Sequence, residues 1–179
     1  MGKDEDIALV KRVKAGDKDA FGKLVQKYKQ QIYFVAYRMT NSHADADDIS
    51  QEAFIKAYES IGSFKEKSSF STWIYRIIVN MTINHLKKIG RKQTFALDEN
   101  ISIENNSDPG EIEEQRQLHE EITKAIGSLP LKQRMVVELA ILEGLPHREI
   151  ANILGCPEKT ISWRLFQARK NLKEKLVYI

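Results

Sequence analysis

The apolar positions of the chain recur mainly at helical intervals. From residue 21 to residue 39 they are spaced three and four apart, which is typical of an amphipathic helix. Ser42 can cap a second helix from residue 43 to about residue 61, and a polar loop at residues 62–71 precedes a third helix at residues 72–88. No stretch alternates apolar and polar residues convincingly, so the pattern predicts an all-α fold.

The helical pattern stops between Gly90 and Gly110. This segment is rich in Asn, Asp, Glu and Ser and ends in Pro-Gly, a composition too polar and aperiodic for a core. Helical spacing then resumes at Glu111, and further breaks occur at residues 127–130 and 144–146. We predict two small helical domains, residues 1–90 and 111–179, joined by a flexible linker at residues 91–110.

The last part of the chain, residues 146–176, has the spacing of a helix-turn-helix. Pro146 suits the first position of a helix. Ala151 is small enough to let the second helix cross closely, Gly155 can adopt the left-handed turn, and Ile161 packs the corner between the helices. One stripe of the final helix is apolar: Ile161, Leu165, Ala168, Leu172 and Leu176. We therefore expect the second domain to end in a helix-turn-helix.

The other face of that final helix carries basic, polar and aromatic side chains. Arg and Lys can neutralise phosphates, Gln and Ser can read base edges, and an aromatic ring can meet a thymine methyl group in the major groove. A charged face is often simply solvated, but two outward aromatic residues favour a contact surface. The candidate DNA-contacting residues are Arg148, Lys159, Thr160, Ser162, Trp163, Arg164, Phe166, Gln167, Arg169 and Lys170.

The predicted helix at residues 43–61 has an acidic face opposite an apolar stripe of Ala46, Ile49, Ala53 and Ala57. Acidic groups around one exposed isoleucine suit docking onto a basic protein helix, with the isoleucine as the anchor. A solvated acidic face is an equally good interpretation, and acids in the first turns also fit the helix dipole. The candidate docking residues are Asp47, Asp48, Gln51, Glu52, Ile55 and Glu59.

The helix at residues 72–88 and the loop before it carry another candidate surface. Aromatic, Arg, Asn and Lys side chains on one face can stack on unpaired bases, hydrogen-bond their edges and hold the backbone. Core packing is an equal alternative for Phe70 and Trp73, and Arg76 could instead be a buried ion-pair partner. The candidate residues are Lys67, Ser69, Phe70, Trp73, Arg76, Asn80, Asn84, Lys87 and Lys88.

The net charge of +3 conceals an uneven distribution of charge. Residues 64–92 contain seven basic residues and one acidic residue, and residues 159–175 contain six and one. Residues 45–52 contain four acids and no base. Two basic segments in an almost neutral chain indicate a polyanion that is contacted at two places.

Composition excludes several classes of protein. The lone Cys156 cannot form an intramolecular disulfide or a multi-cysteine metal site, and it suits a reducing cytosol. The polar start MGKDEDIALV is no signal peptide, and no uncharged apolar run approaches the roughly 20 residues of a membrane span. The histidines are scattered, and neither a glycine-rich phosphate loop nor a Gly-x-Ser-x-Gly motif occurs. We expect a soluble cytoplasmic protein, not itself a membrane protein, that has no cofactor and is not an enzyme.

Three ordered segments resemble bacterial sigma factors of the extracytoplasmic-function (ECF) group. They are DADDISQEAFIKAY, FSTWIYRIIVNMTINHLKK and GLPHREIANILGCPEKTISWRLFQARKNLKEKL, and the similarity covers nearly the whole chain. The resemblance implies a transcription initiation factor that binds the RNA polymerase core and directs it to promoter DNA in a stress or envelope response. It also implies a dedicated anti-sigma factor as a partner, often membrane-bound, that covers the same surfaces.

The resemblance further implies a role for each segment. Residues 1–90 would be region 2, in which residues 47–58 dock on the coiled coil of the largest polymerase subunit and residues 62–88 capture and open the start-proximal promoter element. Residues 111–179 would be region 4, which reads the upstream element as duplex and touches the polymerase flap. The linker would thread towards the active-site channel of the polymerase.

Some positions depart from the family pattern. Trp163 stands where a small hydroxylic residue is frequent, and Gln167 stands where Arg is frequent, so the upstream sequence that is recognised cannot be carried over. His147 and Arg148 replace a more usual aromatic-acidic pair. An operator-binding repressor would also use a helix-turn-helix, but it would not need the acidic face or the second DNA surface. A sequestering adaptor protein is a third hypothesis, which the basic final helix argues against.

Overall fold

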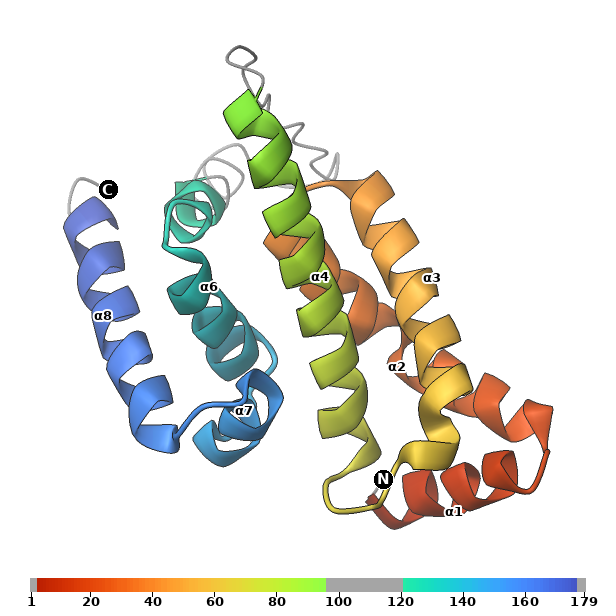
Figure 1. The fold of residues 1–179 in the computed structure, drawn as a ribbon. Helices are drawn as coiled ribbons and strands as arrows, with labels where there is room; N and C mark the ends of the chain where they lie inside the picture. Colours follow the sequence, from red (N-terminus) through yellow and green to blue (C-terminus); the bar gives the residue numbers. More distant parts are fainter. Residues whose placement is uncertain (1–2, 96–120, 177–179) are drawn as a thin grey trace, which may run out of the picture. The chain divides into compact units, whose positions relative to one another are not determined.

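The computed structural model describes residues 3–95 and 121–176 of the chain. Every regular element in these two ranges is helical, and they contain no strand (Figure 1). The helices form two compact units, with α1 to α4 in the first and α6, the first part of α7 and α8 in the second. This confirms the predicted fold of two helical domains, while most of the predicted linker lies outside the described residues. No helix in the described part of the chain is both long and apolar enough to cross a membrane.

The first unit is a bundle of helices in which α2 contacts α1, α3 and α4. Its elements are α1 (Lys3–Lys14), α2 (Lys18–Thr40), α3 (His43–Ser60), the 3₁₀ turn η1 (Ile61–Ser63) and α4 (Phe70–Phe95). α2, α3 and α4 pack against one another, and α1 lies where η1 leads into α4 (Figure 1). The core between these helices includes the fully buried side chains of Leu24, Ile32, Met39, Ile74 and Ile78.

Capping side chains determine where α2 and α3 begin. Asp17 accepts a hydrogen bond from the Ala20 N–H at 3.1 Å, and Ser42 accepts one from the Asp45 N–H at 3.2 Å. Each carboxylate or hydroxyl oxygen thereby satisfies a backbone donor that the first helical turn leaves free. The predicted cap at Ser42 is confirmed.

The boundaries of α4 differ from the predicted helix at residues 72–88. The helix begins at Phe70, because Ser69 accepts hydrogen bonds from the Thr72 and Trp73 N–H groups and so caps its first turn. It also continues through Gly90 into residues 91–95, which the sequence assigns to the linker. A single glycine costs a helix only about 1 kcal/mol, so it need not end one.

The second unit contains the expected helix-turn-helix. Residues 121–127 are helical and are followed by α6 (Leu131–Val137), the π-helical turn η2 (Glu138–Leu142), α7 (His147–Leu154) and α8 (Glu158–Leu176). Leu139, Ile150 and Ile161 are buried in its core. Gly155 joins α7 to α8 with a φ of 62°, so the predicted left-handed turn is confirmed.

Candidate protein-binding and nucleic-acid-binding surfaces

α3 separates its apolar and acidic side chains as predicted. The predicted stripe of Ala46, Ile49, Ala53 and Ala57 is buried against the bundle. All the candidate docking residues are exposed, and Ile55 keeps 59% of its surface accessible. We call this surface the docking face: Asp47, Asp48, Gln51, Glu52, Ile55 and Glu59.

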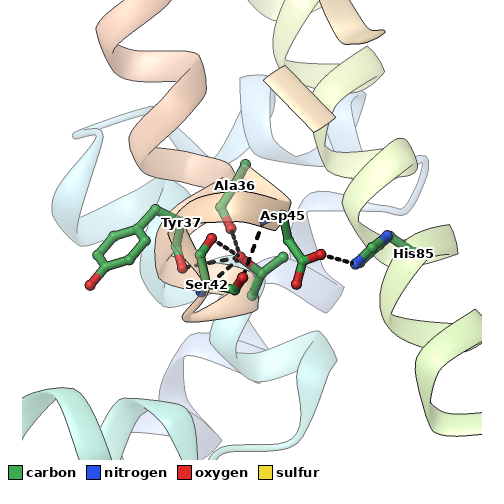
Figure 2. Close-up of polar contacts among 6 residues, drawn as sticks. Ala36, Tyr37, Ser42, Asp45 and His85 are labelled. Atoms are coloured by element: carbon green, nitrogen blue, oxygen red, sulfur yellow. Dashed lines mark hydrogen bonds and ion pairs between the residues drawn. The ribbon is translucent and has the colours of Figure 1, made fainter. Parts of the chain in front are cut away.

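A polar junction holds the first turn of α3 between α2 and α4 (Figure 2). Thr40, at the end of α2, donates from Oγ1 to the Ala36 carbonyl at 2.9 Å and exchanges weaker contacts with the Ser42 backbone. From the same turn, Asp45 points towards α4, where its Oδ1 lies 3.0 Å from His85 Nε2. Asp45 is therefore engaged with α4, unlike the acids of the docking face. The sequence pattern did not indicate that His85 pairs with Asp45.

The solvent side of α4 presents most of the residues predicted to contact DNA. Arg76, Asn80, Asn84, Lys87 and Lys88 are exposed, so Arg76 is not the buried residue that the alternative interpretation required. Trp73 is half-buried at the start of this surface. We call this surface the opening face: Trp73, Arg76, Asn80, Asn84, Lys87 and Lys88.

The structure places Phe70 in the core, and not on the surface that was predicted to contact DNA. Its side chain is 0% exposed, because its ring packs between α2 and the start of α4. The centroid of the Phe70 ring lies 5.5 Å from that of Tyr28, 5.7 Å from that of Trp73 and 6.3 Å from that of Phe64. The core-packing alternative holds for Phe70, whereas Trp73 contributes part of its ring to the core and leaves part accessible.

The two remaining candidates in the loop differ from each other. Lys67 is exposed in the middle of the loop. The Ser69 hydroxyl is occupied within the protein, since it lies 2.8 Å from Ser71 Oγ and 2.7 Å from Thr72 Oγ1 and caps α4. Ser69 therefore acts first as a structural cap in this conformation.

α8 places its apolar stripe inward and its aromatic pair outward. Ile161, Leu165 and Ala168 are buried, whereas Trp163 and Phe166 are 60% and 63% exposed. Leu172 and Leu176, at the end of the predicted stripe, are only partly covered. We call the outer surface the recognition face, and its exposed members are Arg148 of α7 and Lys159, Ser162, Trp163, Phe166, Arg169 and Lys170 of α8.

Three candidates of the recognition face are only partly exposed: Thr160, Arg164 and Gln167. Arg164 Nη1 lies 3.6 Å from Cys156 Sγ, so this guanidinium lies against the turn of the motif. His147 Nδ1, at the start of α7, lies 3.1 Å from the Ser162 hydroxyl. The two helices of the motif are thus joined by polar contacts at the edge of the recognition face.

Shifts in pKa occur outside these surfaces. Burial and a hydrogen bond to Asp6 raise the pKa of Tyr28, and a hydrogen bond from Arg12 lowers the pKa of Asp17. Within the described residues, no three His, Cys, Asp or Glu side chains lie close enough to hold a metal ion.

Comparison with known proteins identifies both units. The family model described as Sigma-70 region 2 matches residues 24–92, and the one described as Sigma-70, region 4 matches residues 119–172. The ECF RNA polymerase sigma-E factor of Escherichia coli is 37% identical over 180 residues, which span 96% of this chain and 94% of that protein. The RNA polymerase sigma-H factor of Pseudomonas aeruginosa is 36% identical over 185 residues, with 98% and 96% covered.

Solved structures share the fold. CnrH, solved in complex with the cytosolic domain of CnrY, superposes with a TM-score of 0.73 at 22% identity and covers 97% of this chain and 98% of its own. The sigma factor RpoE from Bartonella quintana, solved with the anti-sigma factor NepR, gives a TM-score of 0.72 at 26% identity and covers 89% and 98%. The order of the motifs, the two helical units and these full-length similarities agree, and the chain belongs to the ECF family of RNA polymerase sigma factors.

Proposed function

We propose that this sigma factor uses its three exposed faces for three successive tasks in transcription initiation. The docking face binds core RNA polymerase, the recognition face binds the upstream promoter element as duplex, and the opening face holds the start-proximal element once it is unpaired. In this proposal residues 1–90 act as region 2 and residues 111–179 act as region 4. The observation that carries the assignment is that each face is the exposed side of a helix whose other side is buried.

The docking face suits a basic protein partner. Ile55 is a large apolar side chain exposed among Asp48, Glu52 and Glu59, so burying it against a partner would remove apolar surface from water. The surrounding carboxylates would favour a positively charged surface and raise the rate of encounter. Since the family binds polymerase core, we assign this face to the coiled coil of the largest subunit.

The recognition face suits the major groove of duplex DNA. Arg169 and Lys170 can neutralise phosphates, while Trp163 and Phe166 extend far enough from α8 to meet base edges. Because Arg164 lies against the turn, we assign it to phosphate contact and to support of the motif.

The opening face suits bases that have left the stack. A duplex hides the edges that Asn80 and Asn84 would read, and flipping a base costs a few kcal/mol that stacking and hydrogen bonding can offset. Trp73 offers a ring for stacking, and Arg76 offers a charge for the backbone beside it.

We also infer that an anti-sigma factor controls the protein. The RpoE structure that shares this fold contains the anti-sigma factor NepR, and an anti-sigma factor covering any of the three faces would block initiation. The chain in this proposal supplies binding surfaces and no reacting group of its own. Because transcription occurs where the genome is, the proposal locates its action in the cytoplasm.

The docking step is the most direct test. Asp48→Arg combined with Glu52→Arg should abolish copurification with core polymerase and run-off transcription. The reason is that both carboxylates would be replaced by positive charges, which a basic partner repels. A matched control, Glu121→Arg combined with Glu174→Arg, changes the charge equally at exposed acids of the second unit. The control should bind core at the wild-type level.

The same experiment distinguishes a sigma factor from an operator-binding repressor. If the docking variant retains wild-type binding to core, that face is not the docking surface. If the wild-type protein binds duplex DNA tightly and never copurifies with core, the operator-binding repressor becomes the better interpretation.

A further inference from the structure

The loop between η1 and α4, residues 64–69, combines a buried start with an exposed middle. Phe64 is 3% exposed, and its ring centroid lies 5.1 Å from that of Trp73, the first residue of the opening face. Lys65, Glu66 and Lys67 are exposed. The conformation of this loop therefore determines what stands beside Trp73 when a base approaches the opening face.

Lys14, the last residue of α1, contacts this loop in three ways. Its Nζ donates a hydrogen bond to the Phe64 carbonyl at 2.6 Å and lies 3.7 Å from Glu66 Oε1. The same Nζ lies 5.8 Å from the centroid of the Phe64 ring. One ammonium group thus contacts the residues on both sides of Lys65, although it comes from a helix outside the segment that the region 2 family model matches.

Glu66 has a backbone conformation that needs such support. Its φ is 57°, in the left-handed region that residues with a Cβ adopt rarely. A strained residue persists where its surroundings hold it, and here the Lys14 ammonium binds both the Glu66 carboxylate and the nearby Phe64 carbonyl. The loop contains no glycine that would adopt this turn without strain.

We infer that Lys14 is a positioning residue for promoter opening, which holds the loop at residues 64–69 in the conformation that receives an unpaired base beside Trp73. This inference rests on the function proposed for the opening face. Lys14 acts through the loop, since its ammonium group is engaged with Phe64 and Glu66. α1 therefore contributes to promoter opening, in addition to packing on the bundle.

The test compares Lys14→Met with Lys11→Met in the full-length chain. Both variants remove one positive charge from α1, but Lys11 is exposed one turn earlier, and the ammonium group that donates to the Phe64 carbonyl is that of Lys14. Hydrogen exchange of the free protein should show faster exchange of the amides of residues 64–69 in Lys14→Met only. With core polymerase, Lys14→Met should form open complexes roughly three- to tenfold more slowly than Lys11→Met, the order of effect of one ordinary lost hydrogen bond. Core binding should be the same in the two variants.

Two further measurements distinguish positioning from general stabilisation. The defect of Lys14→Met should shrink on a template already mismatched at the start-proximal element, and Lys14→Arg, which can still donate to the Phe64 carbonyl, should recover part of the loss. Equal loop exchange in Lys14→Met and Lys11→Met would overturn the inference. Faster loop exchange with unchanged opening would also overturn it, because the loop would then be ordered without consequence for DNA.

These outcomes are distinct from failure of the proposed function. If the wild-type protein opened no promoter with core polymerase, the function proposed for the opening face would fail, and the positioning role would fail with it. The exchange comparison would still decide whether Lys14 orders the loop.

Discussion

Replacing Phe70 by Ala tests whether this ring belongs to the core or to the DNA surface. The side chain is fully buried and contacts the rings of Tyr28, Phe64 and Trp73. Truncating a buried Phe to Ala costs about 3–5 kcal/mol, and each aromatic pair contributes about 0.5–1.5 kcal/mol beyond its buried area. With three ring neighbours, we expect a loss of about 4 kcal/mol in the free energy of unfolding of the first unit.

Urea unfolding followed by tryptophan fluorescence measures this loss. The chain has two tryptophans, so a Trp163→Phe background leaves Trp73, which contacts Phe70, as the single reporter of the first unit. For a slope of about 2 kcal/mol per molar urea, the midpoint should fall by about 2 M. Phe166→Ala provides the matched control, because Phe166 is 63% exposed and its truncation should change stability by less than about 0.5 kcal/mol.

The reasoning about Phe70 is refuted by either of two results. A midpoint for Phe70→Ala equal to that of Phe166→Ala would mean that the ring is not held in the core. A stable Phe70→Ala protein that binds core but fails to open promoters would return Phe70 to the DNA surface.

Three further predictions concern the DNA surfaces and the start of α2. Arg169→Ala should weaken binding to all duplexes and lower the salt dependence of that binding. Trp163→Ala should change the preferred upstream sequence, with discrimination between bases changed by roughly 1–3 kcal/mol for a lost base contact. Promoter selection at two salt concentrations checks both variants. Asn80→Ala should slow open-complex formation on duplex more than on a pre-melted template, and equal defects in permanganate footprints on both templates would exclude strand trapping. Arg12 lowers the pKa of Asp17, so the ionised carboxylate stabilises the fold at pH values above the ordinary carboxyl pKa. This stabilisation is lost as the pH falls through the lowered pKa of Asp17. Asp17→Asn should therefore flatten the acid limb of a profile of stability against pH.

Features that depend on neighbouring residues could be predicted from the sequence. The inward stripe of α3, the cap at Ser42 and the left-handed Gly155 all follow from spacing or from the conformational preference of one residue. The exposed docking face followed from the same periodicity, because a helix with one buried side necessarily exposes the other.

Features that depend on distant contacts could not be predicted in this way. α1 was not predicted from the sequence, and its Asp6 is only 4% exposed. Asp6 accepts a hydrogen bond from the Tyr28 hydroxyl at 2.5 Å and pairs with the Lys27 ammonium, so partners on α2 make its burial tolerable. The inward direction of Phe70 likewise depends on Tyr28 and Phe64, which helical spacing along α4 does not reveal.

The junction of Asp45 with His85 links the two proposed tasks of the first unit. The docking face lies on α3 and the opening face on α4, and these helices pack directly against each other. The Asp45 carboxylate and the His85 imidazole connect the first turn of α3 to α4 (Figure 2). Binding at the docking face would therefore orient α4 together with α3 as one body, without a separate ordering step. Since an opening face must stand at a defined place when a base leaves the stack, the packing of α3 against α4 would let polymerase docking position the proposed opening face on the promoter.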